Sequence, residues 1–281
     1  MKSVLVRLKE FRKGAHGTEK EIIDYILNNA EKVASGTIYE LAEKTFTSPS
    51  SVVRLCKKIS FNGYKDFKNN LISEVAVQKS AEKMIRKKIT KSDDIENIVD
   101  VITQMNMTGL EHTKNLIDLN TMESCIDLLT AAEGIHVFGI GSSSIVAKDA
   151  QQKFMRIDKR CLVFEDWHLQ HLNAKNMTPK DVGIIISYSG ETDEMIKCAE
   201  VMKENGCEVI SITRYVDSSI SRLSTHNLYV AADESILRSG AISSRISQLN
   251  IIDILYTGVA NRNYEASIDR IYKTHFKKGK Q

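Results

Sequence analysis

The chain has 281 residues, of which 42% are hydrophobic and 27% charged, and this length suffices for two domains that each bury a core. No apolar run approaches the roughly 18 residues of a membrane helix, and charges interrupt the apolar residues of the first segment, so we expect a cytosolic protein without a signal peptide. Residues 1–92 hold 19 Lys and Arg against 10 Asp and Glu, whereas residues 93–281 hold 20 against 26. The basic first part fits a phosphate-backbone partner, although a basic face is often only solvated surface.

N-cap and capping-box patterns predict three short helices near the beginning of the chain. Thr18 and Glu21 can form a capping box ahead of apolar residues at helical spacing, and Thr37 and Glu40 can form a second one. A further helix is predicted in YKDFKNNLISEVAV. The charged stretch after it, residues 79–93, is predicted to be a linker.

The second and third of the short helices fit a helix-turn-helix motif. Ser48 is a potential N-cap, and Pro49 suits the first helical position, where a proline costs no hydrogen bond within the helix. Ala42 stands where the two helices must approach closely, and Val52 and Leu55 would face the core. The outer face of the third helix is predicted to contact DNA through small hydroxyls and cations: Ser48, Ser50, Ser51, Arg54, Lys57 and Lys58.

Arg54 is the predicted base-reading residue, because its two-pronged guanidinium can bind O6 and N7 of guanine. A small helical bundle with a solvated basic face is the alternative. The turn before this helix carries Phe46 where glycine is common. A left-handed phenylalanine costs on the order of 1 kcal/mol, so a different turn geometry is expected.

The apolar period changes in the second part of the chain. Residues 95–132 have helical spacing, whereas the following residues alternate short apolar runs with helical patterns. The runs are IHVFGI, CLVF, VGIIIS, EVISIT and NLYVAA. This alternation predicts an α/β domain with a doubly wound, five-stranded parallel sheet over residues 134 to about 260.

Two of the predicted strands end in loops rich in glycine and serine, GIGSSS and SYSGET. Ligands of an open parallel sheet bind beyond the carboxyl ends of its strands. A phosphate monoester needs several converging donors, and hydroxyls together with backbone N–H groups at a helix start supply them, while glycine lets the backbone approach closely. The predicted phosphate site comprises Gly141, Ser142, Ser143, Ser187, Ser189, Gly190 and Thr192.

Three other interpretations of these loops are open. Ser and Thr are favoured helix N-caps in any protein, so the hydroxyls could serve only the helices that follow. A dinucleotide site would need the third glycine of GxGxxG, which GIGSSS lacks. An isomerase or lyase would need a base in the same crevice, for which Glu234, Glu191, His168 and His171 are candidates, although Glu191 is better placed to brace its own loop.

Metal and redox sites are not predicted. The histidines of WHLQH have helical spacing but no third ligand nearby, and Trp167 fits a core or interface position better than a ligand-stacking one. The cysteines are scattered without a CxxC pair, so we expect reduced thiols in the core or on the surface, at Cys56, Cys125, Cys161, Cys198 and Cys207.

The two loops resemble the phosphate-binding loops of the SIS (sugar isomerase) domain, and a helix-turn-helix followed by a SIS domain resembles the RpiR family of bacterial transcriptional regulators. SSVVRLCKKISFNGYKDFK is similar to the recognition helix and next segment of that family, and ILRSGAISSRISQLNIIDIL to its last strand-to-helix region. The resemblance covers nearly the whole chain. It implies an all-α helix-turn-helix domain at residues 1–78, a linker at 79–93 and a SIS domain at 94–281, with Ser142, Ser143, Ser187, Ser189 and Thr192 holding the phosphate and Glu234 and Ser239 facing the sugar.

These observations together predict a cytosolic DNA-binding regulator of sugar or amino-sugar metabolism. It would bind a palindromic double-stranded operator as a homodimer or homotetramer and sense a phosphorylated sugar, with no catalytic residue, cofactor or metal. The alternative is a sugar-phosphate isomerase or lyase with an accessory helical domain, and a pure interaction module is a third possibility.

Overall fold

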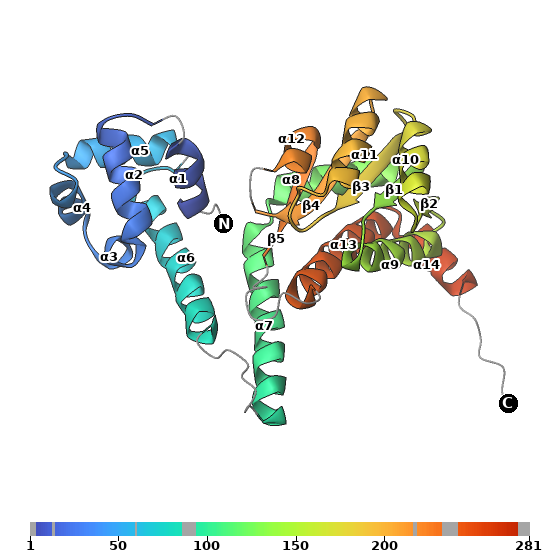
Figure 1. The fold of residues 1–281 in the computed structure, drawn as a ribbon, viewed down its shortest axis with the longest axis horizontal. Helices are drawn as coiled ribbons and strands as arrows, with labels where there is room; N and C mark the ends of the chain where they lie inside the picture. Colours follow the sequence, from blue (N-terminus) through green and yellow to red (C-terminus); the bar gives the residue numbers. More distant parts are fainter. Residues whose placement is uncertain are drawn as a thin grey trace. The chain divides into compact units, whose positions relative to one another are not determined.

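The computed structural model describes residues 4–12, 15–59, 61–85, 94–215, 218–231 and 241–274. The chain divides into two units, residues 1–88 and 89–281, and each has its own hydrophobic core (Figure 1). Among the described residues, no helix combines the length and the apolar character that a membrane span requires.

The first unit consists of helices packed around one core. The positions predicted to face inward, Ala42, Val52 and Leu55, are all buried there. The first and third helices were not predicted, and the last helix runs into the stretch proposed as a linker, whose residues 86–93 lie outside the described part. The helices are α1 (Val4–Arg12), α2 (Thr18–Asn28), α3 (Ala30–Ser35), α4 (Ile38–Lys44), α5 (Pro49–Lys58) and α6 (Tyr64–Ile85).

Two of the three predicted helix starts are confirmed. Thr37 and Glu40 form the complete capping box of α4, and the Ser48 hydroxyl caps α5 with Pro49 at the first helical position. The capping box predicted at Thr18 is wrong, because α2 begins at Thr18 itself. Gly17 takes the N-cap position with a φ of 54°, a backbone conformation that glycine adopts without a steric cost.

The second unit is the predicted doubly wound α/β domain. Its five strands are β1 (Gly134–Phe138), β2 (Cys161–Val163), β3 (Asp181–Ile186), β4 (Glu208–Arg214) and β5 (His226–Val230). All neighbouring pairs are parallel, in the order β2-β1-β3-β4-β5. The helices are α7 (Ile95–Leu116), α8 (Leu119–Ala131), α9 (Ser142–Arg156), α10 (Trp167–Lys175), α11 (Asp193–Glu204), α12 (Ser219–Leu223), α13 (Ile242–Arg262) and α14 (Tyr264–Lys273).

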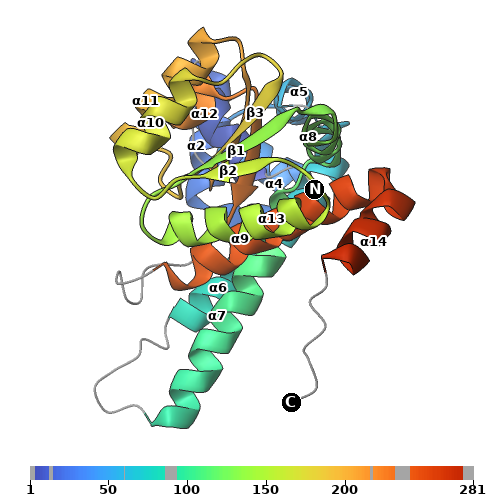
Figure 2. The ribbon, with the colours of Figure 1, turned by 90° about the vertical axis from the view of Figure 1, so that its right-hand side faces the viewer.

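Helices cover both faces of this sheet. Figure 2 shows α9 and α13 on one side of the strands and α10, α11 and α12 on the other. Side chains alternate between the two cores, so Ile184 and Ile186 of β3 pack with α8, α9 and α13, whereas Ile185 between them packs with α10, α11 and α12. Burial on both faces explains why the strands read as continuous apolar runs.

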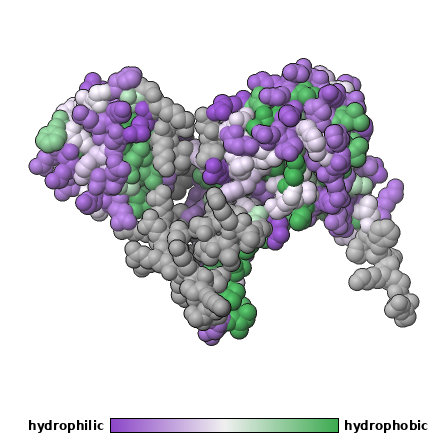
Figure 3. Space-filling view, viewed as in Figure 1, coloured by the Kyte–Doolittle hydropathy of each residue, from purple (hydrophilic) through white to green (hydrophobic). Residues whose placement is uncertain are grey.

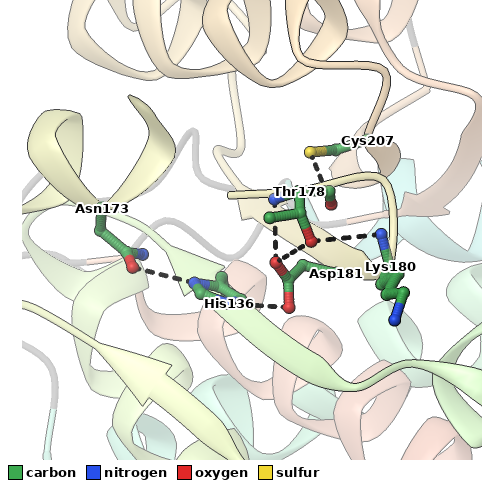
Figure 4. Close-up of polar contacts among 6 residues, drawn as sticks. All are labelled: His136, Asn173, Thr178, Lys180, Asp181 and Cys207. Carbon is green, nitrogen blue, oxygen red and sulfur yellow. Dashed lines mark hydrogen bonds and ion pairs between the residues drawn. The ribbon is translucent and has the colours of Figure 1, made fainter. Parts of the chain in front are cut away.

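A polar network ties the amino-terminal side of the sheet together (Figure 4). The carboxylate of Asp181 accepts hydrogen bonds from the backbone N–H and the hydroxyl of Thr178, both at 2.9 Å. His136 of β1 lies 3.6 Å from this carboxylate through Nε2 and 2.9 Å from Asn173 Oδ1 of α10 through Nδ1. Burial raises the pKa of Asp181, but the Thr178 donors and His136 outweigh it and hold this pKa below its ordinary value.

All five cysteines are buried free thiols, so the core interpretation is confirmed and the surface one is wrong. Burial raises the pKa of Cys56, Cys125, Cys161 and Cys198 to about 12 and that of Cys207 to about 11. The reactive thiolate form is therefore strongly disfavoured at neutral pH.

Candidate ligand site and DNA-binding surface

The winding of the sheet reverses between β1 and β3. The chain leaves β1 into α9 on one face and leaves β3 into α11 on the other face. Phe138, the last residue of β1, pairs in register with Ile185 of β3, so both serine loops begin on adjacent strands about 4.8 Å apart. Because ligands of open parallel sheets bind at such a switch point, the fold brings the two predicted loops to one candidate site.

The first loop turns directly into α9. Gly141 occupies the N-cap position with a φ of 63°, and Ser142 and Ser143 are the first two helical residues. The Ser144 hydroxyl donates to the Gly141 carbonyl at 2.7 Å, whereas the Ser142 side chain has no hydrogen-bond partner among the described residues. Gly139 packs tightly on the helix, since a Cβ there would lie 3.0 Å from the Ser143 backbone.

The second loop is ordered by its own hydroxyls. Ser187 and Thr192 are joined by a 3.0 Å hydrogen bond between their hydroxyls. The Ser187 hydroxyl also accepts from Gly190 N–H at 3.3 Å, and the Ser189 hydroxyl accepts from Glu191 N–H at 3.2 Å. The hydroxyls of Ser187, Ser189 and Thr192 are thus held on one short turn.

The second loop is also supported from α12. The Glu191 carboxylate accepts hydrogen bonds from the Ser219 N–H at 2.9 Å and from its hydroxyl at 2.7 Å, so the bracing role predicted for Glu191 is confirmed. Gly190 has a φ of 70°, and a Cβ there would lie 2.1 Å from Ser218 Oγ. The loop therefore requires glycine at 190 for its conformation and for its packing.

Helix capping does not account for these hydroxyls. The Ser48 and Ser218 side chains cap α5 and α12, but α9 and α11 have no side-chain cap. Thr192 takes the N-cap position of α11, yet its hydroxyl is bonded to Ser187 instead of the helix. The N-cap interpretation of the two loops is therefore wrong, and the first N–H groups of both helices are left without a side-chain acceptor.

The predicted DNA-contacting residues share the outer face of α5. Ser48 Oγ lies 2.8 Å from Ser50 Oγ and 3.0 Å from Ser51 Oγ, and the exposed Arg54 donates to Ser51 Oγ at 3.3 Å. The last helical turn adds two exposed lysines, Lys57 and Lys58. Lys58 forms an ion pair with Glu19 of α2, which offsets its charge.

The turn between α4 and α5 keeps the geometry that glycine usually provides. Phe46 itself adopts the left-handed conformation, with a φ of 51°. The Thr47 N–H donates to the Ala42 carbonyl at 2.8 Å and the Phe46 N–H donates to the Glu43 carbonyl at 3.1 Å, which is the hydrogen-bond pattern of a Schellman motif. The expectation of a different turn geometry is therefore wrong.

Comparisons with known proteins agree with both halves of this architecture. Residues 2–78 match the helix-turn-helix domain of the rpiR family, and residues 128–258 match the SIS domain. An HTH-type transcriptional regulator of Caldanaerobacter subterraneus is 33% identical over 94% of this chain and 93% of its own length. The chain belongs to the RpiR family.

Two further relatives of this RpiR-family regulator cover almost its whole length. YbbH, an HTH-type transcriptional regulator of Bacillus subtilis, is 35% identical over 92% of this chain and 90% of its own length. The solved structure of the Vibrio vulnificus NanR protein complexed with ManNAc-6P is 31% identical, covers 96% of both chains and has a TM-score of 0.60. The chain is therefore a transcriptional regulator that combines a DNA-binding helix-turn-helix with a SIS domain.

One residue that supports the first serine loop was not predicted from the sequence. Gln170 of α10 is 0% exposed, accepts a hydrogen bond from Gly139 N–H at 3.1 Å and donates one to the Gly139 carbonyl at 3.2 Å. It therefore clamps the start of the first serine loop. The spacing of Trp167, Gln170 and Ala174 along one helical face was the signal that could have placed it inward.

Replacing Gln170 with alanine is expected to lower the free energy of unfolding of the SIS domain by about 2–6 kcal/mol. The change leaves both the buried N–H and the buried carbonyl of Gly139 without a partner, at about 1–3 kcal/mol each. Urea denaturation followed by circular dichroism measures the loss. His168→Ala is the matched control, because His168 is an exposed residue of the same helix and its removal should leave the midpoint unchanged.

The structure describes some of the remaining predicted residues and not others. Glu234 and Ser239 lie outside the described residues. Trp167 packs against the core under α10 and α11, with its ring centroid 5.1 Å from that of His171 and Lys197 over its face, in agreement with a core position. Within the described part of the chain, no three His, Cys, Asp or Glu side chains are grouped as metal ligands.

Proposed function

We propose that the SIS domain binds a phosphorylated sugar between the two serine loops and that binding changes the affinity of the helix-turn-helix for its operator. The observation that carries this proposal is the gathering of five Ser and Thr hydroxyls at the β1/β3 switch point, none of which caps the helix behind it. Such donors bind a phosphate without burying a counter-charge.

The start of α9 is the better phosphate position of the two. Its first turn contains no acidic residue, whereas the first turn of α11 contains Asp193 and Glu194. A helix N-terminus favours an anion, but neighbouring carboxylates repel one. We therefore place the phosphate on Ser142, Ser143 and the first N–H groups of α9, with Ser187, Ser189 and Thr192 closing the site from the second loop.

We further propose that the effector is an amino-sugar phosphate and that the protein does not turn it over. The NanR structure, with 31% identity over 96% of both chains, was solved with ManNAc-6P, which supports this ligand class. Both carboxylate oxygens of Glu191 are occupied by Ser219, which argues against Glu191 as a catalytic base.

A thermal-shift screen tests the ligand proposal. Hexose, pentose and N-acetylated amino-sugar phosphates are compared with the same sugars lacking phosphate and with inorganic phosphate. A ligand present at 100 times its Kd should stabilise the folded protein by about 2.7 kcal/mol, and the amino-sugar phosphates should give the largest shift. The absence of a shift with every phosphosugar would contradict the proposal, and consumption of the sugar would favour the isomerase or lyase alternative.

We also propose that the regulator acts as a homo-oligomer on a palindromic operator. The second half of α7 packs closely along α13, since a Cβ at Gly109 would lie 2.4 Å from Ser243 Oγ. The first half extends beyond the sheet and exposes Ile95 and Val99, four residues apart on one face, and Figure 3 shows apolar surface at this end. A second copy of the chain would bury that surface, and a monomeric mass by light scattering would contradict the proposal.

A further inference from the structure

Phe46 has a backbone conformation in which its side chain destabilises the fold. Its φ of 51° lies in the left-handed region, where a Cβ crowds the backbone and glycine is preferred. The side chain is 97% exposed, so burial of the ring contributes no stabilisation that would offset this strain. Glycine at position 46 would make the folded helical unit more stable. The phenylalanine therefore indicates a function other than folding.

The ring is presented beside the helix that reads DNA. Phe46 lies in the turn between α4 and α5, two residues before the N-cap Ser48. Ser50 and Ser51 follow in the first turn of α5. In helix-turn-helix proteins the N-terminal residues of the second helix enter the major groove. Figure 3 shows an isolated patch of apolar surface at the α4–α5 end of the helical unit, where hydrophilic side chains otherwise predominate.

The turn that carries Phe46 is held rigidly. The two Schellman hydrogen bonds fix its backbone on both sides of the ring. The hydroxyl of the buried Thr45 donates to the Leu41 carbonyl at 2.8 Å and lies 2.9 Å from Thr47 Oγ1. A side chain on such a preorganised support loses little conformational freedom on binding.

We propose that Phe46 is a base-reading residue whose ring packs against the C5-methyl group of a thymine in the major groove. The hydroxyls of α5 and Arg54 suit phosphates and polar base edges, whereas a phenyl ring gains nothing from either. The thymine methyl is the apolar group that the major groove presents. Phe46 thereby adds a preference for thymine at one position of each half-site, which rests on the proposed palindromic operator but not on the phosphosugar proposal.

The test compares thymine with deoxyuracil, which lacks only the methyl group. A duplex selected by the wild-type protein from a random-sequence library serves as the probe, and each thymine is replaced in turn. The wild type should lose about fourfold in affinity at one position of each half-site. The Phe46→Gly variant should bind the thymine duplex more weakly by the same factor and should not respond to that replacement.

Two controls separate this role from a structural one. Phe46→Gly should melt at the same temperature as the wild type or above it, because glycine relieves the strained φ and no buried contact is lost. Tyr39→Ala removes another exposed ring, 74% exposed on α4, and should keep the full response to deoxyuracil. Wild-type affinity of Phe46→Gly, or an equal loss on both duplexes, would overturn the proposal.

Discussion

The double variant Ser187→Ala, Ser189→Ala is expected to lose at least two orders of magnitude in phosphosugar affinity. Each hydrogen bond to a charged phosphate oxygen contributes about 1.5–3 kcal/mol, and the variant removes two donors. The fold should persist, because alanine fits the space of serine. The variant also loses the hydrogen bonds of Ser187 with Thr192 and Gly190 and that of Ser189 with Glu191, so a stability decrease of about 1.5–4.5 kcal/mol is expected as well.

Regulation, not DNA recognition, should be lost in this variant. The serines lie in the unit formed by residues 89–281, whereas the helix-turn-helix belongs to residues 1–88. Operator affinity without ligand should therefore equal that of the wild type. The effect of ligand on DNA binding, typically 1–3 kcal/mol and reciprocal, should vanish at ligand concentrations that saturate the wild type.

The measurement is an operator titration of both proteins with and without the most stabilising phosphosugar of the screen. Ser124→Ala is the matched control, since its hydroxyl donates to the Asn120 carbonyl of the same helix at 3.0 Å. Ser124→Ala should keep the full ligand response. If the double variant kept it too, the hydroxyls of the second loop would serve only to order the loop itself.

The sheet and its two loops were predictable because their signals are local. Each strand is a short apolar run, and each serine loop follows its strand directly in the chain. The supports of the loops were not predictable in the same way. Gln170 reaches Gly139 over 31 positions of sequence, and Ser219 reaches Glu191 over 28. Helical spacing can therefore place Gln170 inward, but it identifies neither contact. Only packing in three dimensions selects these partners.

In the first unit, local sequence preferences gave wrong predictions at two places. Backbone preference argues against a left-handed phenylalanine, yet the bonds from Phe46 and Thr47 to α4 impose that conformation. At Thr18, a favourable capping pattern was overruled by Gly17, which starts the helix one residue earlier than predicted. Conflicts between local preference and the fold are expected at functional positions, which fits the role proposed for Phe46 but gives no explanation for Gly17.

Replacing Arg54 with alanine is expected to cost about 1–3 kcal/mol on the selected operator and much less on a scrambled duplex. The Arg54 guanidinium is exposed on α5 and is oriented by its 3.3 Å bond to Ser51 Oγ, toward the N-terminal end of the helix. In helix-turn-helix proteins the residues at this end enter the major groove. A bidentate contact with a guanine edge discriminates between bases, so the loss should be confined to the operator. Phosphosugar binding should be unchanged.

The two lysines of the last turn of α5 provide the comparison for Arg54. Lys57→Ala should weaken binding to operator and scrambled duplex alike and reduce the salt slope by about 1, as the loss of one phosphate contact requires. Lys58→Ala should have a smaller effect than Lys57→Ala, because its ion pair with Glu19 already offsets the charge. Titrations of all three variants on both duplexes over a range of salt concentrations separate these outcomes. Equal losses on the two duplexes for Arg54→Ala would make Arg54 a phosphate contact and assign base reading to other side chains of the exposed face.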